Sequence, residues 1–78
     1  MKTTLYFQAT RRRPDRVVIQ DAWIELVVHH AVKQVVQSDG HTHRWAQVDE
    51  AGGRHLRVIL LQDGETVHNA FFDRRFTP

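Results

Sequence analysis

The chain has 78 residues, with eleven Lys and Arg against nine Asp and Glu, a net charge of +2, and it contains no cysteine. This length suits one domain over residues 1–78 with a single small core, and the absence of cysteine excludes disulfides and thiolate metal sites. No stretch has the length of a signal peptide's apolar region or of a membrane span, so we expect a cytoplasmic protein with no membrane partner.

The first predicted element is a strand over residues 3–10, because apolar and polar side chains alternate there with the period of a half-buried strand. Like charges and a proline interrupt this pattern between Arg11 and Arg16, which predicts a solvated connection. Arg11, Arg12 and Arg13 are either ordinary surface residues or a basic arm that contacts phosphate.

From Ile19 the apolar spacing changes to that of a helix, and we predict one helix from about Gln20 to His30. Trp23 lies on its apolar stripe and is the expected anchor on the sheet, because a large ring buries more surface than its neighbours. The histidines at the end of this helix, His29 and His30, are favoured there by the helix dipole, so they need no ligand role.

Residues 31–37 are rich in β-branched side chains and precede a turn, which favours a strand, although their spacing would also allow the helix to continue. A turn at Asp39 and Gly40 then leads into another strand over residues 42–48. The segment 49–53 is predicted to be a loop, because its two consecutive glycines permit a chain reversal.

The clearest folding signal is the segment from Arg54 to Phe76, in which two apolar and aromatic runs flank a two-residue Asp63-Gly64 turn. Such a turn would pair residues at equal distances from it and so separate two faces. The predicted core face carries Arg54, Leu56, Val58, Leu60, Val67, Asn69, Phe71 and Asp73. The predicted outer face carries His55, Arg57, Ile59, Leu61, Thr66, His68, Ala70 and Phe72, with Arg74 following on the same side.

The predicted order is therefore one strand, one helix and four further strands joined by short turns. This order indicates an α+β domain, in which one helix covers one face of a mostly antiparallel sheet of about five strands. The opposite face of the sheet would remain open for a partner or a ligand.

This open face is the predicted functional surface. Nine of the eleven cations are arginine, whose guanidinium suits bidentate contacts to phosphate. Most of them lie in three clusters, at residues 11–16, 54–57 and 74–75. The predicted register brings Arg57, His68 and Arg74 together, where arginine could hold a phosphate and histidine could transfer a proton in metal-free RNA cleavage. Further contacts to RNA are expected from Arg54, His55, Arg75, Arg11, Arg12 and Arg13.

Two other interpretations compete with this one. His68 could be an ordinary surface histidine, and the mixed basic face could simply be a half-covered sheet surface. The chain also has six histidines, and His41 and His43 stand close together, so a histidine metal module is a further alternative. The spacing does not supply the three or four convergent ligands of a zinc site, so we predict no metal and no cofactor.

Several short segments resemble the small RelE/BrnT-like toxins of bacterial toxin–antitoxin operons and related uncharacterised bacterial domains. They are the early predicted strand, the helix around residues 21–25, the Asp39-Gly40 turn, the strand at residues 54–58 and the closing segment at residues 71–76. The resemblance implies a metal-independent endoribonuclease acting on mRNA, in which Arg57 and either Arg74 or Arg75 serve cleavage. It also implies a separate antitoxin protein as partner.

Two departures from these toxins bear on the predicted activity. Asp73 stands where they often carry a histidine before the terminal arginine, and the usual lysine-rich helical surface is thin. A non-catalytic protein-binding or dimerisation module of the same fold, which could form a homodimer, is therefore the alternative to a nuclease.

Overall fold

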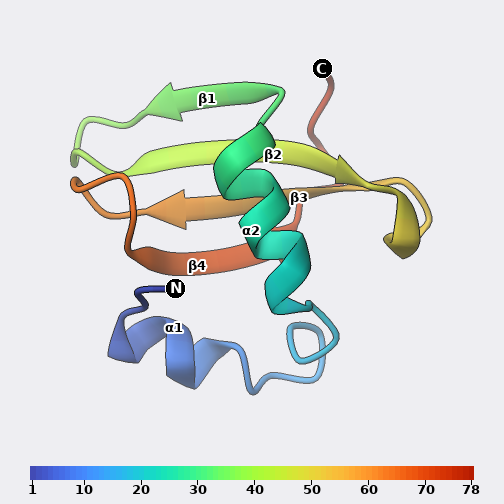
Figure 1. The fold of residues 1–78 in the computed structure, drawn as a ribbon, viewed down its shortest axis with the longest axis horizontal. Helices are drawn as coiled ribbons and strands as arrows, with labels where there is room; N and C mark the ends of the chain where they lie inside the picture. The colour runs from blue at the N-terminus through green and yellow to red at the C-terminus, as the bar shows by residue number, and fades with distance from the viewer.

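The computed structural model describes residues 1–78 as two helices followed by a four-stranded antiparallel sheet, which confirms the α+β class. The helices are α1 (Leu5–Thr10) and α2 (Asp21–His30). The strands are β1 (Lys33–Val36), β2 (Thr42–Val48), β3 (Arg54–Leu60) and β4 (Val67–Phe72), with a short 3₁₀ helix at Asp49–Ala51. Each strand lies beside its neighbour in sequence, in the order β1-β2-β3-β4 (Figure 1).

The N-terminal segment is a helix, so the predicted strand over residues 3–10 is wrong. The hydroxyl oxygen of Thr4 accepts a hydrogen bond from the backbone N–H of Phe7 at 3.0 Å, which satisfies one of the free amides at a helix start. Phe7 and Thr10, one helical turn apart, are the buried residues of α1. Leu5, which an alternating pattern would place in the core, is 89% exposed.

This N-terminal segment lies along the β4 edge of the sheet (Figure 1). Thr3 forms a parallel bridge with Val67. The backbone N–H of Thr4 donates to the carbonyl of Val67 at 3.1 Å, and the N–H of Val67 donates to the carbonyl of Lys2 at 2.8 Å. The backbone at the start of β4 is therefore paired on its outer side. At the other edge of the sheet, all four residues of β1 are exposed, so this edge is open to solvent.

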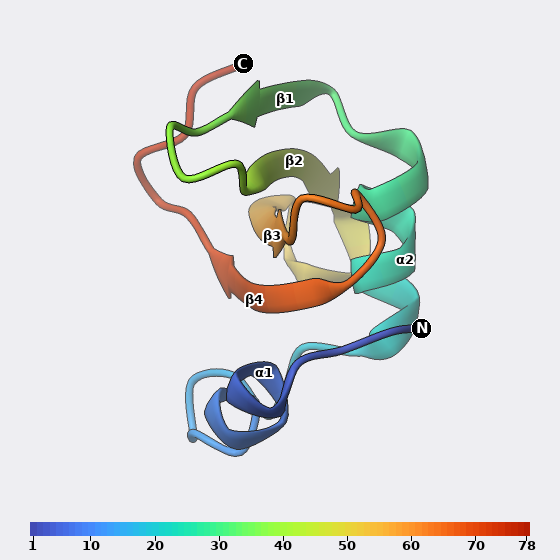
Figure 2. The same ribbon diagram turned by 90° about the vertical axis from the view of Figure 1, so that its left-hand side faces the viewer.

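The second helix confirms the prediction for residues 20–30. It packs against β2 and β3 and covers one face of the sheet (Figure 2), with Trp23, Ile24 and Val27 buried. The ring of Trp23 lies 6.2 Å from that of Phe72, centre to centre, so Trp23 is an anchor between helix and sheet, as predicted. Neither helix combines the length and the apolar character needed to cross a bilayer.

The core fills the space between α2, α1 and one face of the sheet. Its largest fully buried side chains are Ile24, Val27, Val48, Leu56, Val58, Leu60 and Val67. All but the first two come from strands, so most of the burial that stabilises the domain depends on β2, β3 and β4. The strands predicted at residues 31–37 and 42–48 are present as β1 and β2.

The hairpin of β3 and β4 does not close with the predicted two-residue turn. The backbone N–H of Leu61 donates to the carbonyl of Thr66 at 2.9 Å, so the loop comprises residues 62–65. Within it, the carboxylate of Asp63 accepts hydrogen bonds from the hydroxyl and backbone N–H of Thr66 and from the N–H of Glu65. These bonds lower the pKa of Asp63 to about 2.

The predicted register holds only at the start of β4. Leu60 pairs with Val67 as expected, but the register then shifts and Ile59 pairs with Asn69, which leaves His68 without a partner. This bulge allows Val67 and Ala70, three residues apart, both to be buried against the core, which strict strand alternation would prevent.

Beyond the bulge, the two faces of β4 are therefore exchanged relative to the prediction. Ala70 is buried and Phe72 packs against the core, although both were expected on the outer face. Phe71 and Asn69, which were expected in the core, lie on the outer side, where Phe71 pairs with Arg57. A shift of one residue is enough to produce this exchange.

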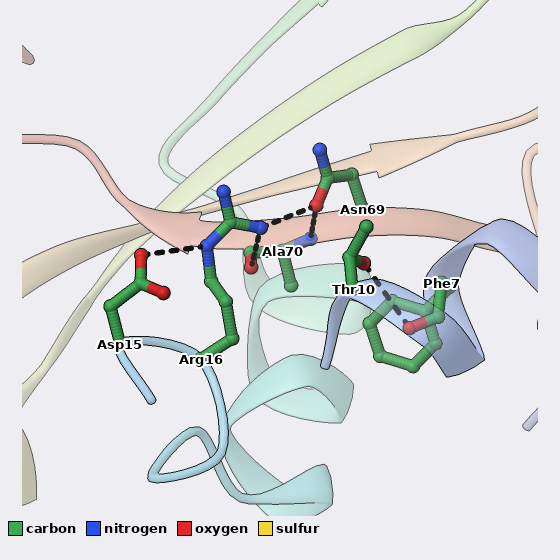
Figure 3. Close-up of polar contacts among 6 residues, drawn as sticks. All are labelled: Phe7, Thr10, Asp15, Arg16, Asn69 and Ala70. Atoms are coloured by element: carbon green, nitrogen blue, oxygen red, sulfur yellow. Dashed lines mark hydrogen bonds and ion pairs between the residues drawn. The ribbon is translucent and has the colours of Figure 1, made fainter. Parts of the chain in front are cut away.

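The connection between α1 and α2 is attached to β4 by Arg16 (Figure 3), so the predicted solvated connection is wrong at this residue. The Nη1 atom of Arg16 donates to the side-chain oxygen of Asn69 at 2.8 Å and lies 3.4 Å from the carbonyl oxygen of Ala70. Its Nε atom lies 3.3 Å from the carboxylate of Asp15. Arg12 and Arg13 are exposed, as predicted.

Candidate functional site

The structure does not bring together the three residues predicted to form the catalytic site. Arg57 lies in the middle of β3. His68 lies at the bulge, where its Nδ1 atom is 3.1 Å from the hydroxyl of Thr4 and its ring stacks on that of Tyr6 at 4.7 Å. Arg74 follows β4. The register on which their grouping depended is wrong, and no hydrogen bond, ion pair or ring contact joins any two of them.

Arg57 instead belongs to a polar cluster on the outer face of the sheet. Its Nε and Nη2 atoms lie 3.0 and 2.7 Å from Nδ1 of His43. Its Nη1 atom lies 3.5 Å from Oδ2 of Asp73, and the indole N–H of Trp45 donates to the same oxygen at 3.0 Å. The guanidinium also lies over the ring of Trp45, 4.9 Å from its centre.

The charges in this cluster keep Arg57 bound to internal partners. Burial lowers the pKa of His43, and the positive charge of Arg57 lowers it further. Neutral His43 can then accept a hydrogen bond from the guanidinium at Nδ1. The hydrogen bond from Trp45 lowers the pKa of Asp73, which favours its charged form. Arg57 therefore stabilises the sheet face and is not free to clamp a phosphate.

We expect the domain to lose stability as the pH falls through the ordinary histidine pKa of 6.5, because the unfolded chain then binds more protons than the folded one. The pKa of folded His43 lies below its ordinary 6.5. The contribution of His43 to the free energy of unfolding is fully present above pH 6.5 and is lost as the pH falls towards the pKa of the folded state. Urea denaturation should show a shallower pH dependence for His43→Asn, whose amide oxygen can accept from Arg57 but cannot be protonated.

The matched control for this pH dependence is His30→Asn, because His30 is exposed and makes no side-chain hydrogen bond. This variant should keep the pH dependence of the wild type. Equal slopes in the wild type and in His43→Asn would show that the buried imidazole does not couple folding to pH.

The C-terminal segment covers part of the outer face, opposite α2 (Figure 2), so this face is less open than predicted. The ring of Phe76 stacks on that of Trp45, with centres 5.3 Å apart and planes inclined by 15°. It also lies 4.9 Å from the ring of His55, and the Nζ atom of Lys33 lies 5.8 Å from its centre. The segment begins at Asp73, which is held by Trp45.

Two neighbouring hollows lie at the end of β4. One, of about 280 Å³, is lined by Arg54, His55, Phe72, Asp73, Arg74 and Phe76. The other, of about 300 Å³, is lined by Asp15, Arg16, Arg54, Phe71, Phe72 and Arg74. Arg54, Phe72 and Arg74 border both hollows, and we refer to these three residues together with His55 as the arginine–aromatic site.

The two arginines of this site have no carboxylate partner. Arg54 donates from Nε to the carbonyl of Ala51 at 2.9 Å, and its guanidinium lies 3.8 Å from the centre of the Phe72 ring. The side chain of Arg74 makes no hydrogen bond or ion pair with the chain and is exposed. Both guanidinium groups therefore have N–H donors available, and that of Arg54 lies beside the ring of Phe72.

The nearby carboxylates already have partners. Asp73 accepts hydrogen bonds from Trp45 and lies against Arg57, while Asp15 lies against Arg16. Because these acids are paired within the chain, the charge of the arginine–aromatic site remains positive. Free guanidinium donors beside a ring can hold a phosphate and stack with a planar base.

The other predicted RNA-binding residues do not join this site. Arg11 forms an ion pair with Asp21 at the start of α2. Arg12 and Arg13 lie exposed after α1 without side-chain partners, and Arg75 is exposed in the C-terminal segment. The prediction that these residues contact RNA therefore remains a prediction.

The six histidines do not converge on one point. The rings of His41 and His68 lie 5.3 Å apart, and His41 lies 3.4 Å from the carboxylate of Asp39. No group of three or more His, Asp or Glu side chains lies in an arrangement that could hold a metal ion.

The sequence reasoning missed His43, Trp45 and Asp73 as a cluster with Arg57. The sequence does indicate that His43 and Trp45 lie close together, because they are two residues apart in β2 and so lie on the same face of the sheet. Nothing in the local sequence places Asp73 beside them, since that contact depends on the bulge and on the path of the C-terminal segment.

The segments that resemble RelE/BrnT-like toxins lie in several different elements. Residues 21–25 begin α2, the Asp39-Gly40 turn joins β1 to β2, residues 54–58 form most of β3, and residues 71–76 run from β4 into the C-terminal segment. The early strand of that resemblance is α1 in the structure. Comparison of the chain with protein-family models, curated proteins and solved structures found no match.

Proposed function

We propose that the protein binds single-stranded RNA through the arginine–aromatic site. The observation that supports this most directly is the position of Arg54 and Arg74, which border the same two hollows as Phe72 and have no carboxylate partner. Sites for single-stranded nucleic acid combine cations for the phosphates with aromatic rings on which bases stack. Two neighbouring hollows beside the ring of Phe72 could hold successive nucleotides of one RNA strand.

A second candidate function is metal-independent cleavage of that RNA, as in the toxins that the sequence resembles. His55 favours it, because this histidine lines the same hollow as Arg54 and Arg74, whereas His68 lies at the bulge. The imidazole would take the proton of a ribose 2′-hydroxyl while its oxygen attacks the adjacent phosphorus. The bond from phosphorus to the 5′-oxygen then breaks, this oxygen takes a proton from water, and a 2′,3′-cyclic phosphate remains, while the arginines stabilise the added negative charge. The imidazolium of His55 returns its proton to the resulting hydroxide.

In this role the chain would act in the cytoplasm as the toxin component of a toxin–antitoxin pair. An antitoxin that neutralises it would have to cover the arginine–aromatic site, so antitoxin and RNA would compete. The cation pair of Arg54 and Arg74 favours an acidic segment of the antitoxin at this position.

Fluorescence anisotropy with a labelled single-stranded RNA of about ten nucleotides tests binding, at salt concentrations of about 50 mM and about 200 mM. We expect saturable binding that weakens as salt rises. The absence of binding at the lower salt concentration would contradict the proposal.

Gel analysis of the same RNA tests cleavage. His55→Gln should abolish any cleavage without abolishing binding, because the arginines remain in place. His68→Gln is the matched control and should cleave like the wild type. If His68→Gln loses cleavage and His55→Gln keeps it, the catalytic histidine is His68.

A further inference from the structure

Phe76 separates the arginine–aromatic site from the ring of Trp45. It lines the hollow that contains Arg54, His55 and Arg74, and its other side stacks on Trp45. Trp45 is only 7% exposed. Removal of the Phe76 ring would therefore extend this hollow as far as the indole.

We infer that Phe76 occupies a position for an RNA base, and that Trp45 is a second stacking surface, uncovered when the C-terminal segment moves. This inference rests on the proposed RNA binding and adds to it a named stacking subsite. An incoming base would take the place of the phenyl ring against Trp45, while its phosphate lies towards Arg54 and Arg74.

The surroundings of Phe76 would also suit the ring of a base. The two rings are nearly parallel, at 15°, which is a stacking geometry. The Nζ atom of Lys33 and the imidazole of His55 lie beside Phe76, and neither side chain makes a hydrogen bond or an ion pair with the chain. A phenyl ring meets these groups only through its π system, whereas the edge of a base also offers hydrogen-bond donors and acceptors to both.

The C-terminal segment is attached in a way that allows Phe76 to leave. Its first residue, Asp73, is held firmly, because the backbone N–H of Asp73 donates to the carbonyl of His55 at 2.9 Å and its carboxylate accepts from Trp45. Beyond Asp73 the ring of Phe76 makes the main contact with the sheet, through Trp45, His55 and Lys33. Opening at residues 74–75 would break the hydrogen bonds from the N–H of Arg75 to the carboxylate of Asp73 (3.0 Å) and from the N–H of Phe76 to its carbonyl (3.4 Å). It would leave the bonds that hold Asp73 to His55 and Trp45 in place.

The test uses Phe76→Ala in the full chain, with Trp23→Phe also present so that Trp45 is the only tryptophan. Thr77→Ala in the same background is the matched control, because it changes the next residue of the segment. We expect adenosine, which has no phosphate, to quench the fluorescence of Trp45 in Phe76→Ala but not in the parent or the control. The affinity for single-stranded RNA should rise about fivefold or more, the effect of one added stacked base.

A second variant, Phe76→Leu, keeps an apolar side chain over Trp45 and should give a smaller gain in affinity for single-stranded RNA. It provides the test if Phe76→Ala does not fold. The inference is overturned if the parent binds RNA but both variants bind it no better and show no quenching by adenosine. If no protein in the set binds RNA, the proposed function fails, and the inference fails with it.

Discussion

Leu56→Ala is expected to lower the free energy of unfolding by about 2–5 kcal/mol, because it removes a fully buried side chain and leaves a cavity. Leu56 is 0% exposed and lies in β3, between Ala46 on β2 and Phe72 on β4. A small domain has a total stability of only about 5–15 kcal/mol. The variant should therefore unfold at a much lower urea concentration, as measured by far-ultraviolet circular dichroism.

The control for this loss is Leu5→Ala, which makes the same chemical change at a residue that is 89% exposed. Its effect should stay within about 0.5 kcal/mol, as for most surface substitutions. A loss as large as that of Leu56→Ala would mean that Leu5 is buried, and it would support a strand at residues 3–10 in place of α1.

The second large effect concerns RNA binding. Arg54→Ala combined with Arg74→Ala should weaken binding of single-stranded RNA at least about tenfold at moderate salt, because both cations lose their phosphate contacts. The slope of log affinity against log salt should become shallower by about 1.4, since each phosphate contact on a single strand contributes about 0.7. Anisotropy titrations at several salt concentrations measure both quantities.

The charge-matched control is Arg12→Ala combined with Arg13→Ala, which removes two cations that have no side-chain partner in the fold. It should keep most of the affinity, with a small general loss from the lower net charge. If this control loses as much affinity as the Arg54 and Arg74 variant, the basic arm after α1 is the main RNA contact, and the arginine–aromatic site is the wrong assignment.

The elements that could be predicted from the sequence are those specified by local patterns. The spacing of Trp23 and Val27 predicts a helix, and the turn residues at Asp39 and Gly40 predict the hairpin of β1 and β2. α1 could not be predicted in this way, because six residues are too few to separate a helical pattern from alternation. The hydrogen bond accepted by the side chain of Thr4 decides the outcome, and it becomes visible only in the structure.

The candidate site was predictable only where it does not depend on the bulge in β4. Arg54 and His55 begin β3 and Arg74 follows β4, so they meet at the open end of the hairpin whether or not the register shifts by one residue. The contact of Arg57 with His68 required an unshifted register over the whole hairpin. The packing of Val67 and Ala70 against a common core sets that register, and this packing is not a local property.

The contrast between the two edges of the sheet limits how the protein can assemble with itself. The β1 edge is free, whereas β4 is bordered by the N-terminal segment and by Arg16. Two copies that join through β1 would pair their exposed edge strands, while Val67 at the start of each β4 stays paired with Lys2 and Thr4 of its own chain. Such a pair would have a continuous eight-stranded sheet, and the occupied start of β4 would oppose its extension by further copies.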